Sequence, residues 1–203
     1  MTQDSLPDNI REEILLKLYR TADVLDWELL SNPAKTRQYE AWFADKEIGE
    51  ILLGYFAAKR VRVWIKDTAM KEYSRAQEGI GRTVRYVPRR YRGPQEVIDA
   101  ALGEGWVLDQ SSIEIKPMLC AATRGEDRKV VIWGSKTALS DLLWEAMQQS
   151  VDKGTDPIVV IVTRDGQDVQ PSERLRHTSL GARCGVKVVH LHRDMIDNPD
   201  YVG

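Results

Sequence analysis

The sequence has few of the residues that hold metal-bound or disulfide-rich domains together. It contains two cysteines and three histidines among 203 residues. A structural zinc site needs about four such ligands at close spacing, and the closest pair here is His190-x-His192. Cys120 and Cys184 lie in apolar or strand-like sequence, outside any Cys-x-x-Cys pair. We therefore expect buried free thiols and no metal or redox role for either cysteine.

Long apolar runs are also missing. No stretch approaches the ~20 apolar residues that a membrane-spanning helix needs, and Met1-Thr-Gln-Asp-Ser carries neither a basic region nor an apolar signal segment. We expect a cytoplasmic protein with no membrane partner. With 42% apolar and 30% charged residues, the composition is globular. The length suits a domain of about 100 residues preceded by an N-terminal region.

Positive charge is concentrated in one segment. Residues 1–33 carry seven acidic and three basic residues, 34–58 four and three, 59–92 three and eleven, and 93–203 seventeen and twelve. The net charge of −2 therefore hides one basic segment of net charge +8. Such a segment is typical either of nucleic-acid contact or of a solvated loop that neutralises its acidic neighbours.

The densest part of the basic segment combines arginine with tyrosine. Arginine binds phosphate oxygens through paired hydrogen bonds, and tyrosine can stack on an unpaired base. We therefore predict that this part binds nucleic acid, either DNA or RNA. The residues concerned are Arg82, Arg85, Tyr86, Arg89, Arg90, Tyr91 and Arg92.

The region before this segment is predicted to be mainly helical. Apolar residues at three- and four-residue spacing predict helices over 7–30 and 34–59. Alternating apolar and basic residues predict a short strand over Val61–Ile65, followed by a helix from Asp67 to Gln77. The Arg-, Pro- and Gly-rich stretch that follows separates two parts of the chain. We predict a helical region at 1–81, a basic linker or strand at 82–93, and an α/β domain at 94–203.

Strand and helix patterns alternate from residue 94 onwards. Val130–Trp133 and Ile158–Val162 are unbroken apolar runs, as expected of central strands covered on both faces. The short connections allow parallel crossovers through the intervening helices. The patterns predict helices at 94–103, 136–151 and 171–183, and strands at 105–109, 113–123, 129–133, 157–163 and 186–191.

This element order over 94–163 resembles the core of the PD-(D/E)XK nucleases, the restriction-endonuclease and Holliday-junction-resolvase superfamily. The resemblance implies a restriction-endonuclease-like mixed sheet flanked by helices. In that family an Asp on the second core strand and a Glu-x-Lys on the third hold Mg²⁺. Carboxylates suit this role because they bind hard cations, which lower the pKa of the attacking water.

Aligned by element order, this chain lacks the family's acids. The sequence reads Pro117-Met-Leu-Cys-Ala-Ala122 where the Asp should fall and Ile132-Trp-Gly134-Ser-Lys136 where the Glu-x-Lys should fall. Lys136 matches the family lysine, Gly134 replaces the glutamate, and Glu96 matches a helix glutamate of some members. The resemblance thus implies a pseudo-nuclease that needs no cofactor. Such a chain would serve as a nucleic-acid-binding accessory subunit in a bacterial antiviral defence or DNA-processing complex.

A second alignment uses the literal Glu114-Ile-Lys116, with Asp109 five residues earlier. Glu114 and Lys116 face the same side of a strand, and Asp109 joins them only if residues 110–112 turn the chain. This alignment implies a Mg²⁺-dependent nuclease that uses Asp109, Glu114 and Lys116, with Glu96. An exposed strand face carrying an ion pair is the alternative, and Pro117 favours an edge strand.

Three further alternatives remain open. Gly134-Ser-Lys136-Thr137 opens a predicted helix, where backbone N–H groups receive a phosphate or a hydroxyl caps the helix. Arg174, Arg176 and His177 share one predicted helix and form either an anion-binding face or its solvent side. The Trp- and Tyr-rich N-terminal helices suit docking on a larger protein complex, which would make the chain an interaction module.

Overall fold

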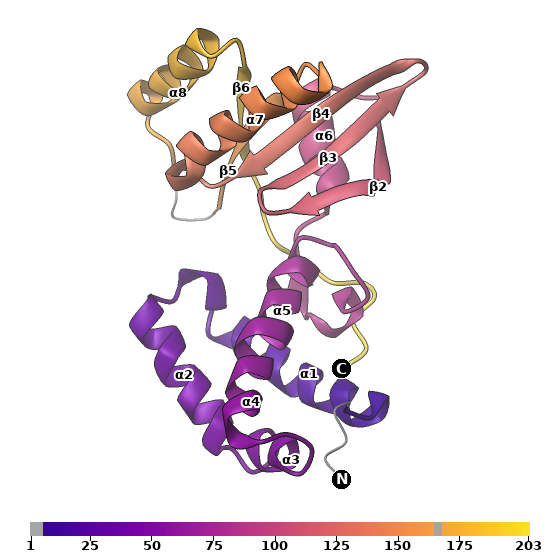
Figure 1. The fold of residues 1–203 in the computed structure, drawn as a ribbon, viewed down its shortest axis with the longest axis vertical. Coiled ribbons are helices and arrows are strands. Elements are labelled where there is room, and N and C mark those ends of the chain that lie inside the picture. Colours follow the sequence, from indigo (N-terminus) through magenta and orange to yellow (C-terminus); the bar gives the residue numbers. More distant parts are fainter. Residues whose placement is uncertain (1–5, 165–167) are drawn as a thin grey trace. The chain divides into compact units, whose positions relative to one another are not determined.

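The computed structural model describes residues 6–164 and 168–203, and these form two compact units (Figure 1). The helical unit comprises the described residues up to Tyr91 together with Ile196–Gly203. The α/β unit comprises Arg92–Met195. Each unit has its own apolar core. The described part of the chain contains no helix long and apolar enough to cross a membrane.

The helical unit packs its helices around a core rich in aromatic side chains, including Tyr19, Trp27, Trp42 and Tyr73. Ser31 begins the second helix, because its hydroxyl accepts a hydrogen bond from the Ala34 N–H. The helices are α1 (Asp8–Val24), α2 (Asn32–Ala44), α3 (Gly49–Leu53), α4 (Ala58–Val63) and α5 (Met70–Gln77), with short 3₁₀ turns at Trp27–Leu29 and Val84–Tyr86.

The first two predicted helices are shorter than expected. The helix expected over 7–30 ends at Val24, and Asp26 then adopts a left-handed φ of 46°. The helix expected over 34–59 breaks after Ala44, before Gly49. A Cβ atom on Gly49 would lie 1.9 Å from the Phe43 carbonyl oxygen. The chain therefore folds back on itself here at a distance that only glycine permits.

The prediction of a strand over Val61–Ile65 is wrong. This run is helical, because α4 continues into a π-helical turn at Trp64–Ala69 that leads into α5. Val61 and Ile65, four residues apart, are both fully buried, whereas Val63 is 51% exposed. Five residues of alternating character are too few to distinguish a strand from a helix that buries every fourth residue.

The α/β unit contains a five-stranded mixed sheet in the order β2-β3-β4-β5-β6. Strands β2, β3 and β4 are antiparallel to one another, whereas β4, β5 and β6 are parallel. Helix α6 packs on one face, and α7 and α8 pack on the other (Figure 1). The bounds are α6 (Pro94–Leu102), β2 (Val107–Ile115), β3 (Met118–Arg124), β4 (Asp127–Gly134), α7 (Leu139–Lys153), β5 (Ile158–Thr163), α8 (Pro171–Arg183) and β6 (Lys187–His192).

The predicted fold class is confirmed: a helical N-terminal region precedes a mixed α/β sheet flanked by helices. Two strands differ in their bounds. β2 begins within the predicted strand 105–109 and continues without a break through 110–112 to Ile115. The predicted strand 113–123 is divided by a turn at Lys116-Pro117, so that its first part belongs to β2 and its second part to β3. Pro117 has no N–H to donate to a neighbouring strand, which accounts for the turn at this point.

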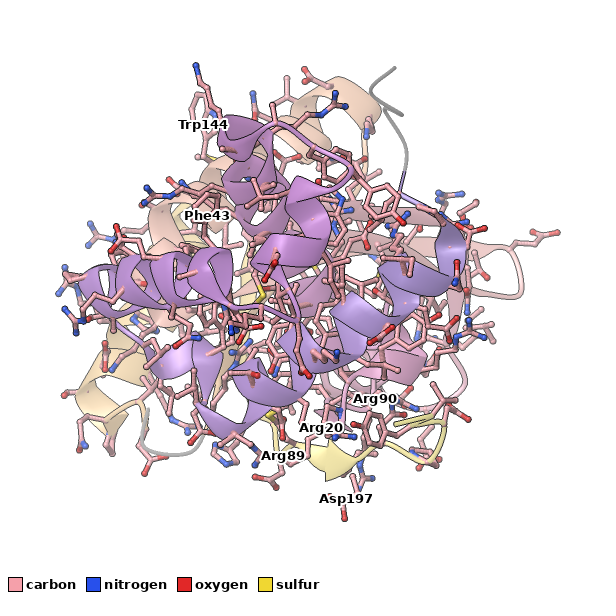
Figure 2. The ribbon with its side chains drawn as sticks, turned by 90° about the horizontal axis from the view of Figure 1, so that it is seen from below. Arg20, Phe43, Arg89, Arg90, Trp144 and Asp197 are labelled. Carbon is pink, nitrogen blue, oxygen red and sulfur yellow. The ribbon has the colours of Figure 1, made fainter. Side chains whose placement is uncertain are left out.

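The C-terminal residues return to the helical unit. β7 (Ile196–Asp197) pairs antiparallel with β1 (Arg89–Arg90). We predicted from the sequence that residues 196–203 belong to the α/β domain. The Asn198 amide fixes this pairing, because it donates to the carbonyl oxygens of Val84 (2.7 Å) and Val87 (2.8 Å). Figure 2 shows Asp197 on this strand beside the helices of the same unit.

Candidate nucleic-acid interface

Several arginines of the basic segment are engaged inside the helical unit. The Arg89 Nε atom donates to both carboxylate oxygens of Asp23, at 3.1 Å each, and the guanidinium also contacts Asp26 at 3.2 Å. Arg90 donates to Asn198 at 2.9 Å and lies 3.7 Å from Asp200. Much of the positive charge near 89–90 is therefore neutralised by acids of the same unit.

Both tyrosines of the segment are buried, Tyr86 with 7% and Tyr91 with 3% of its surface exposed. The Arg85 guanidinium lies 4.9 Å from the Tyr86 ring centre and donates to the Tyr86 hydroxyl at 2.6 Å. This hydrogen bond raises the pKa of Arg85, which also approaches Glu12 at 3.6 Å. Neither ring therefore presents an open face on which a base could stack, contrary to the role expected of the tyrosines.

Arg82 and Arg92 differ from the other basic residues of the segment. Both are exposed, and neither forms an ion pair with a residue that the structure describes. Arg92 opens the α/β unit. Arg82 lies in the turn after α5, at the wall of a pocket in the helical unit.

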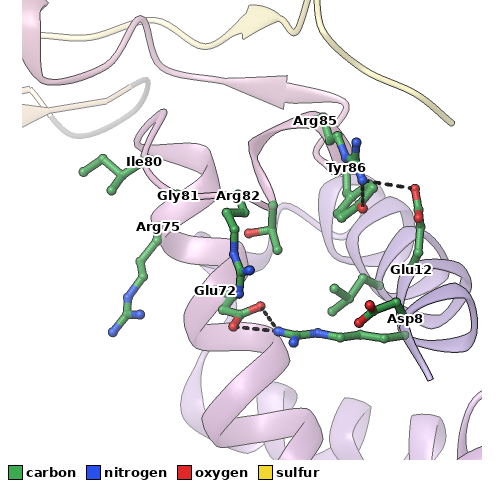
Figure 3. A pocket seen from close by; sticks show the side chains of 12 residues that line it. Asp8, Glu12, Glu72, Arg75, Ile80, Gly81, Arg82, Arg85 and Tyr86 are labelled. Carbon is green, nitrogen blue, oxygen red and sulfur yellow. Dashed lines mark hydrogen bonds and ion pairs between the residues drawn. The ribbon is translucent and has the colours of Figure 1, made fainter. Parts of the chain in front are cut away.

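This arginine pocket, with a volume of about 810 Å³, is formed by α1, α5 and the turn 80–86 (Figure 3). Four arginines line it: Arg11, Arg75, Arg82 and Arg85. Three carboxylates, Asp8, Glu12 and Glu72, also line it. Three residues predicted from the sequence, Arg82, Arg85 and Tyr86, therefore meet in one concave site.

The arginines of the pocket are of two kinds. Arg11 donates to both oxygens of Glu72, at 2.9 and 3.0 Å, and Arg85 faces Glu12. Arg75 and Arg82 are exposed and form no ion pair with any described residue. Figure 3 shows Arg82 directed toward the Arg11–Glu72 pair, with Arg75 at the rim on the other side of α5. These two guanidinium groups are free to bind an anion such as phosphate.

The nuclease-like positions of the α/β unit are occupied by apolar side chains. Leu119 and Cys120 of β3 are buried where the family Asp should fall, and burial raises the pKa of the Cys120 thiol to about 12. A Cβ atom on Gly134 would lie 3.3 Å from two methyl groups of Leu142. A side chain at residue 134 would therefore require Leu142 to shift by a few tenths of an ångström.

Both polar residues that match the family by element order are held in ion pairs. Lys136 donates to Glu173 at 3.3 Å. The Arg193 guanidinium donates to Glu96 at 2.9 Å and to the Gly93 carbonyl at 3.3 Å, and its side chain has no exposed surface. Arg193 thus supplies the positive charge that neutralises Glu96.

The structure brings together some of the residues of the second nuclease alignment. A register shift in β2 places Asp109 opposite Ala121 and Glu114 opposite Leu119, so both carboxylates face the same side of the sheet. Asp109 accepts from the Ser111 hydroxyl at 2.6 Å, which lowers the pKa of the Asp109 carboxyl. Lys116 lies in the turn that follows.

Asp109 also forms an ion pair with Arg128 at 3.4 Å, so its carboxylate is already surrounded by donors. A divalent ion at this edge would need oxygen ligands from several side chains. Among the residues that the structure describes, no group of three or more His, Cys, Asp or Glu side chains is arranged to hold a metal ion.

The sequence did not identify two residues of the arginine pocket, and it identified His177 without its neighbours His190 and Glu173. Arg11 and Arg75 lie outside the arginine-rich run 82–92. Arg75 does lie in the basic segment 59–92, so the charge of that segment was the one sequence signal that pointed to it. In the α/β unit, His177 stacks on His190 with 3.1 Å between ring nitrogens, and Glu173 lies 3.9 Å from His177. Burial and the neighbouring His177 lower the pKa of His190.

Comparison of the chain with protein-family models, curated proteins and solved structures gave no significant match. The likeness to PD-(D/E)XK nucleases therefore depends on the order of the elements and on the mixed five-stranded sheet.

Proposed function

We propose that this chain is a nucleic-acid-binding accessory protein that contacts the phosphate backbone through the arginine pocket of the helical unit. One observation carries the proposal: Arg75 and Arg82 lie exposed at a concave site without an acidic partner among the described residues, beside two arginines held by carboxylates. The restriction-endonuclease-like arrangement of the α/β unit suggests a bacterial defence or DNA-processing complex as the setting.

Guanidinium groups suit phosphate because their planar fork matches two phosphate oxygens at once. Contacts of this kind position a protein on nucleic acid without reading its sequence. The Arg11–Glu72 and Arg85–Glu12 pairs line the same pocket, where their carboxylates reduce its net positive charge. We expect binding with little sequence preference.

The α/β unit supports a role without cleavage. The residues at the family's acid positions are apolar or glycine, Leu142 fills the space beside Gly134, and Glu96 is neutralised by the buried Arg193. A metal ion would have no paired carboxylates to bind on this alignment. The unit then acts as a nuclease-like scaffold.

Binding of labelled single- and double-stranded DNA and RNA, measured by fluorescence anisotropy, tests the proposal. The double variant R75E/R82E should lose about tenfold or more in affinity, because each reversal replaces a phosphate contact with a repulsion. R37E/K46E reverses two exposed basic residues of the same unit that lie outside the pocket, and it should bind like the unaltered protein. Equal affinities for all three proteins, or a loss confined to R37E/K46E, would contradict the pocket as the interface.

A Mg²⁺-dependent nuclease is the second candidate, because the register shift in β2 turns Asp109 and Glu114 to the same face. Cleavage of labelled DNA and RNA in Mg²⁺ or Mn²⁺ is compared with cleavage in EDTA. This candidate requires metal-dependent cleavage that both E114A and K116A abolish while their circular dichroism spectra stay unchanged. Cleavage that survives in the E114A/K116A double variant would remove these residues from the reaction.

A further inference from the structure

A second concave surface of the helical unit lies between α2 and the run formed by α4 and the π-helical turn. It has a volume of about 820 Å³, and α2 and α4 lie side by side along it (Figure 1). Each wall is one face of a helix, because the lining residues of α2 include Lys35, Tyr39 and Phe43 at four-residue spacing. We call this surface the α2–α4 groove.

The groove has an apolar surface that this unit does not cover. Phe43 and Tyr39 pack partly against the core and partly face the groove. Val63 on the opposite wall is 51% exposed, whereas Val61 of the same helix is completely buried. Apolar side chains on both walls suit an apolar ligand surface.

The charges around the groove are mainly positive. Four basic residues line it, Lys35, Lys59, Arg62 and Lys66, against two acids, Glu40 and Asp67. Both acids already have basic neighbours, because Glu40 lies 3.8 Å from Arg62 and Asp67 lies 2.9 Å from Lys71. Neither Lys59 nor Lys66 forms an ion pair with a described residue.

The π-helical turn contributes Lys66 and Asp67 to the lining of the groove. Lys66 lies within Trp64–Ala69, where one extra residue per turn alters the direction of the side chains relative to an α-helix. The groove-lining pairs nevertheless recur every four residues, at 58–59, 62–63 and 66–67. The wall therefore presents a continuous stripe across the junction of two helix types, with lysines at both ends.

We propose that the α2–α4 groove binds an acidic amphipathic helix of a partner protein. The lining residues of α2 span 32–43, which corresponds to about 17 Å of helix, or roughly three turns. Apolar residues at i, i+3 or i+4, and i+7 of the partner helix contact Tyr39, Phe43 and Val63. Its acidic residues face Lys59 and Lys66. This site is independent of the arginine pocket.

The groove suits a peptide better than a nucleic acid. Its single arginine, Arg62, is held near Glu40, and the remaining cations are lysines, which lack the bidentate geometry that favours phosphate. The Tyr39 ring packs against Trp27 and Trp42, and Phe43 packs against the core, so both rings are only partly open to a base. The charge pattern selects an acidic ligand, and the apolar walls select one with an aliphatic or aromatic face.

Selection from a phage-displayed library of random 16-residue peptides on the full-length protein tests the inference. The library is first depleted on the variant K59E/K66E. We expect enrichment of peptides with apolar residues at helical spacing and flanking Asp or Glu. A synthetic copy of an enriched peptide should bind K59E/K66E and V63K about tenfold more weakly. It should bind the matched control R37E/K46E, whose substituted residues lie outside the groove, within about twofold of the unaltered protein.

Three results would overturn the inference. The first is no enrichment beyond that on K59E/K66E. The second is enrichment of peptides that lack acidic residues or the apolar spacing. The third is competition between the peptide and a ten-nucleotide oligo-dT, together with weaker binding of that oligonucleotide to K59E/K66E. This result would make the groove a nucleic-acid site. Circular dichroism of each variant establishes that it is folded.

Discussion

The two units of this chain use arginine in opposite ways. In the α/β unit, Arg193 is completely buried and bound to Glu96. In the helical unit, Arg75 and Arg82 are exposed and line a pocket. The α/β unit therefore uses an arginine as a structural contact, whereas the helical unit leaves two arginines exposed to solvent.

The largest expected effect is the removal of the buried guanidinium in the α/β unit. Arg193→Ala leaves Glu96 partly buried without its counter-charge, so we expect a loss of about 3–5 kcal/mol in the free energy of unfolding. Urea denaturation followed by fluorescence measures it. The matched control is Arg92→Ala, which removes an exposed arginine and should change stability by about 0.5 kcal/mol or less. A loss below about 1 kcal/mol for Arg193→Ala would contradict a stabilising role of the Arg193–Glu96 pair.

Matched glycine substitutions should disturb the two units separately. A Cβ atom on Gly49 would lie 1.9 Å from the Phe43 carbonyl oxygen, and one on Gly181 would lie 2.4 Å from a Val188 methyl carbon and 2.7 Å from the Val186 carbonyl oxygen. We expect each Gly→Ala change to cost about 1–3 kcal/mol, with Gly49→Ala the more damaging because backbone yields less than a side chain.

Amide hydrogen exchange locates the damage from these substitutions. Protection should fall in α2 and α3 for Gly49→Ala and in α8 and β6 for Gly181→Ala. Lys46→Ala and Ser179→Ala, at exposed sites nearby, are the controls. Loss of protection throughout both units in either glycine variant would show that the units unfold together.

The smallest expected effect is a pH dependence confined to the α/β unit. Burial and then His177 and Arg174 lower the pKa of His190, against the opposing influence of Glu173. The folded pKa is therefore below the ordinary value of 6.5. The neutral form contributes stability above about pH 6.5 that is lost as the pH falls below it. Urea denaturation at pH 7.5 and 5.5 should show a smaller loss for His190→Gln than for the unaltered protein, and equal losses would contradict this role.

The difference between the units also decides how much of the fold the sequence predicts. Val130–Trp133 and Ile158–Val162 become β4 and β5 because unbroken apolar runs suit strands covered on both faces. The helical unit was harder to predict, since Val61–Ile65 has too few residues to define a period and the break before Gly49 depends on a contact with Phe43. The pairing of 196–197 with Arg89–Arg90 joins segments more than 100 residues apart and leaves no local signal.

The same physical limit applies to the candidate site. The sequence predicts a basic segment and names Arg82, because local charge density is visible in one dimension. It does not predict that Asp23 engages Arg89, or that Arg11 meets Glu72 in the same pocket as Arg82, because those partners lie 66 and 61 residues apart. Folding determines which arginines stay available and which are neutralised.

The salt dependence of nucleic-acid affinity is the most direct test of phosphate contact by the arginine pocket. Log Kd for double-stranded DNA is measured against log salt concentration for the unaltered protein and for R75A/R82A. Each lost phosphate contact should reduce the magnitude of the slope by about 1, so we expect a reduction of about 2 for the double variant. An unchanged slope, or affinity independent of salt in the unaltered protein, would contradict phosphate contact by this pocket.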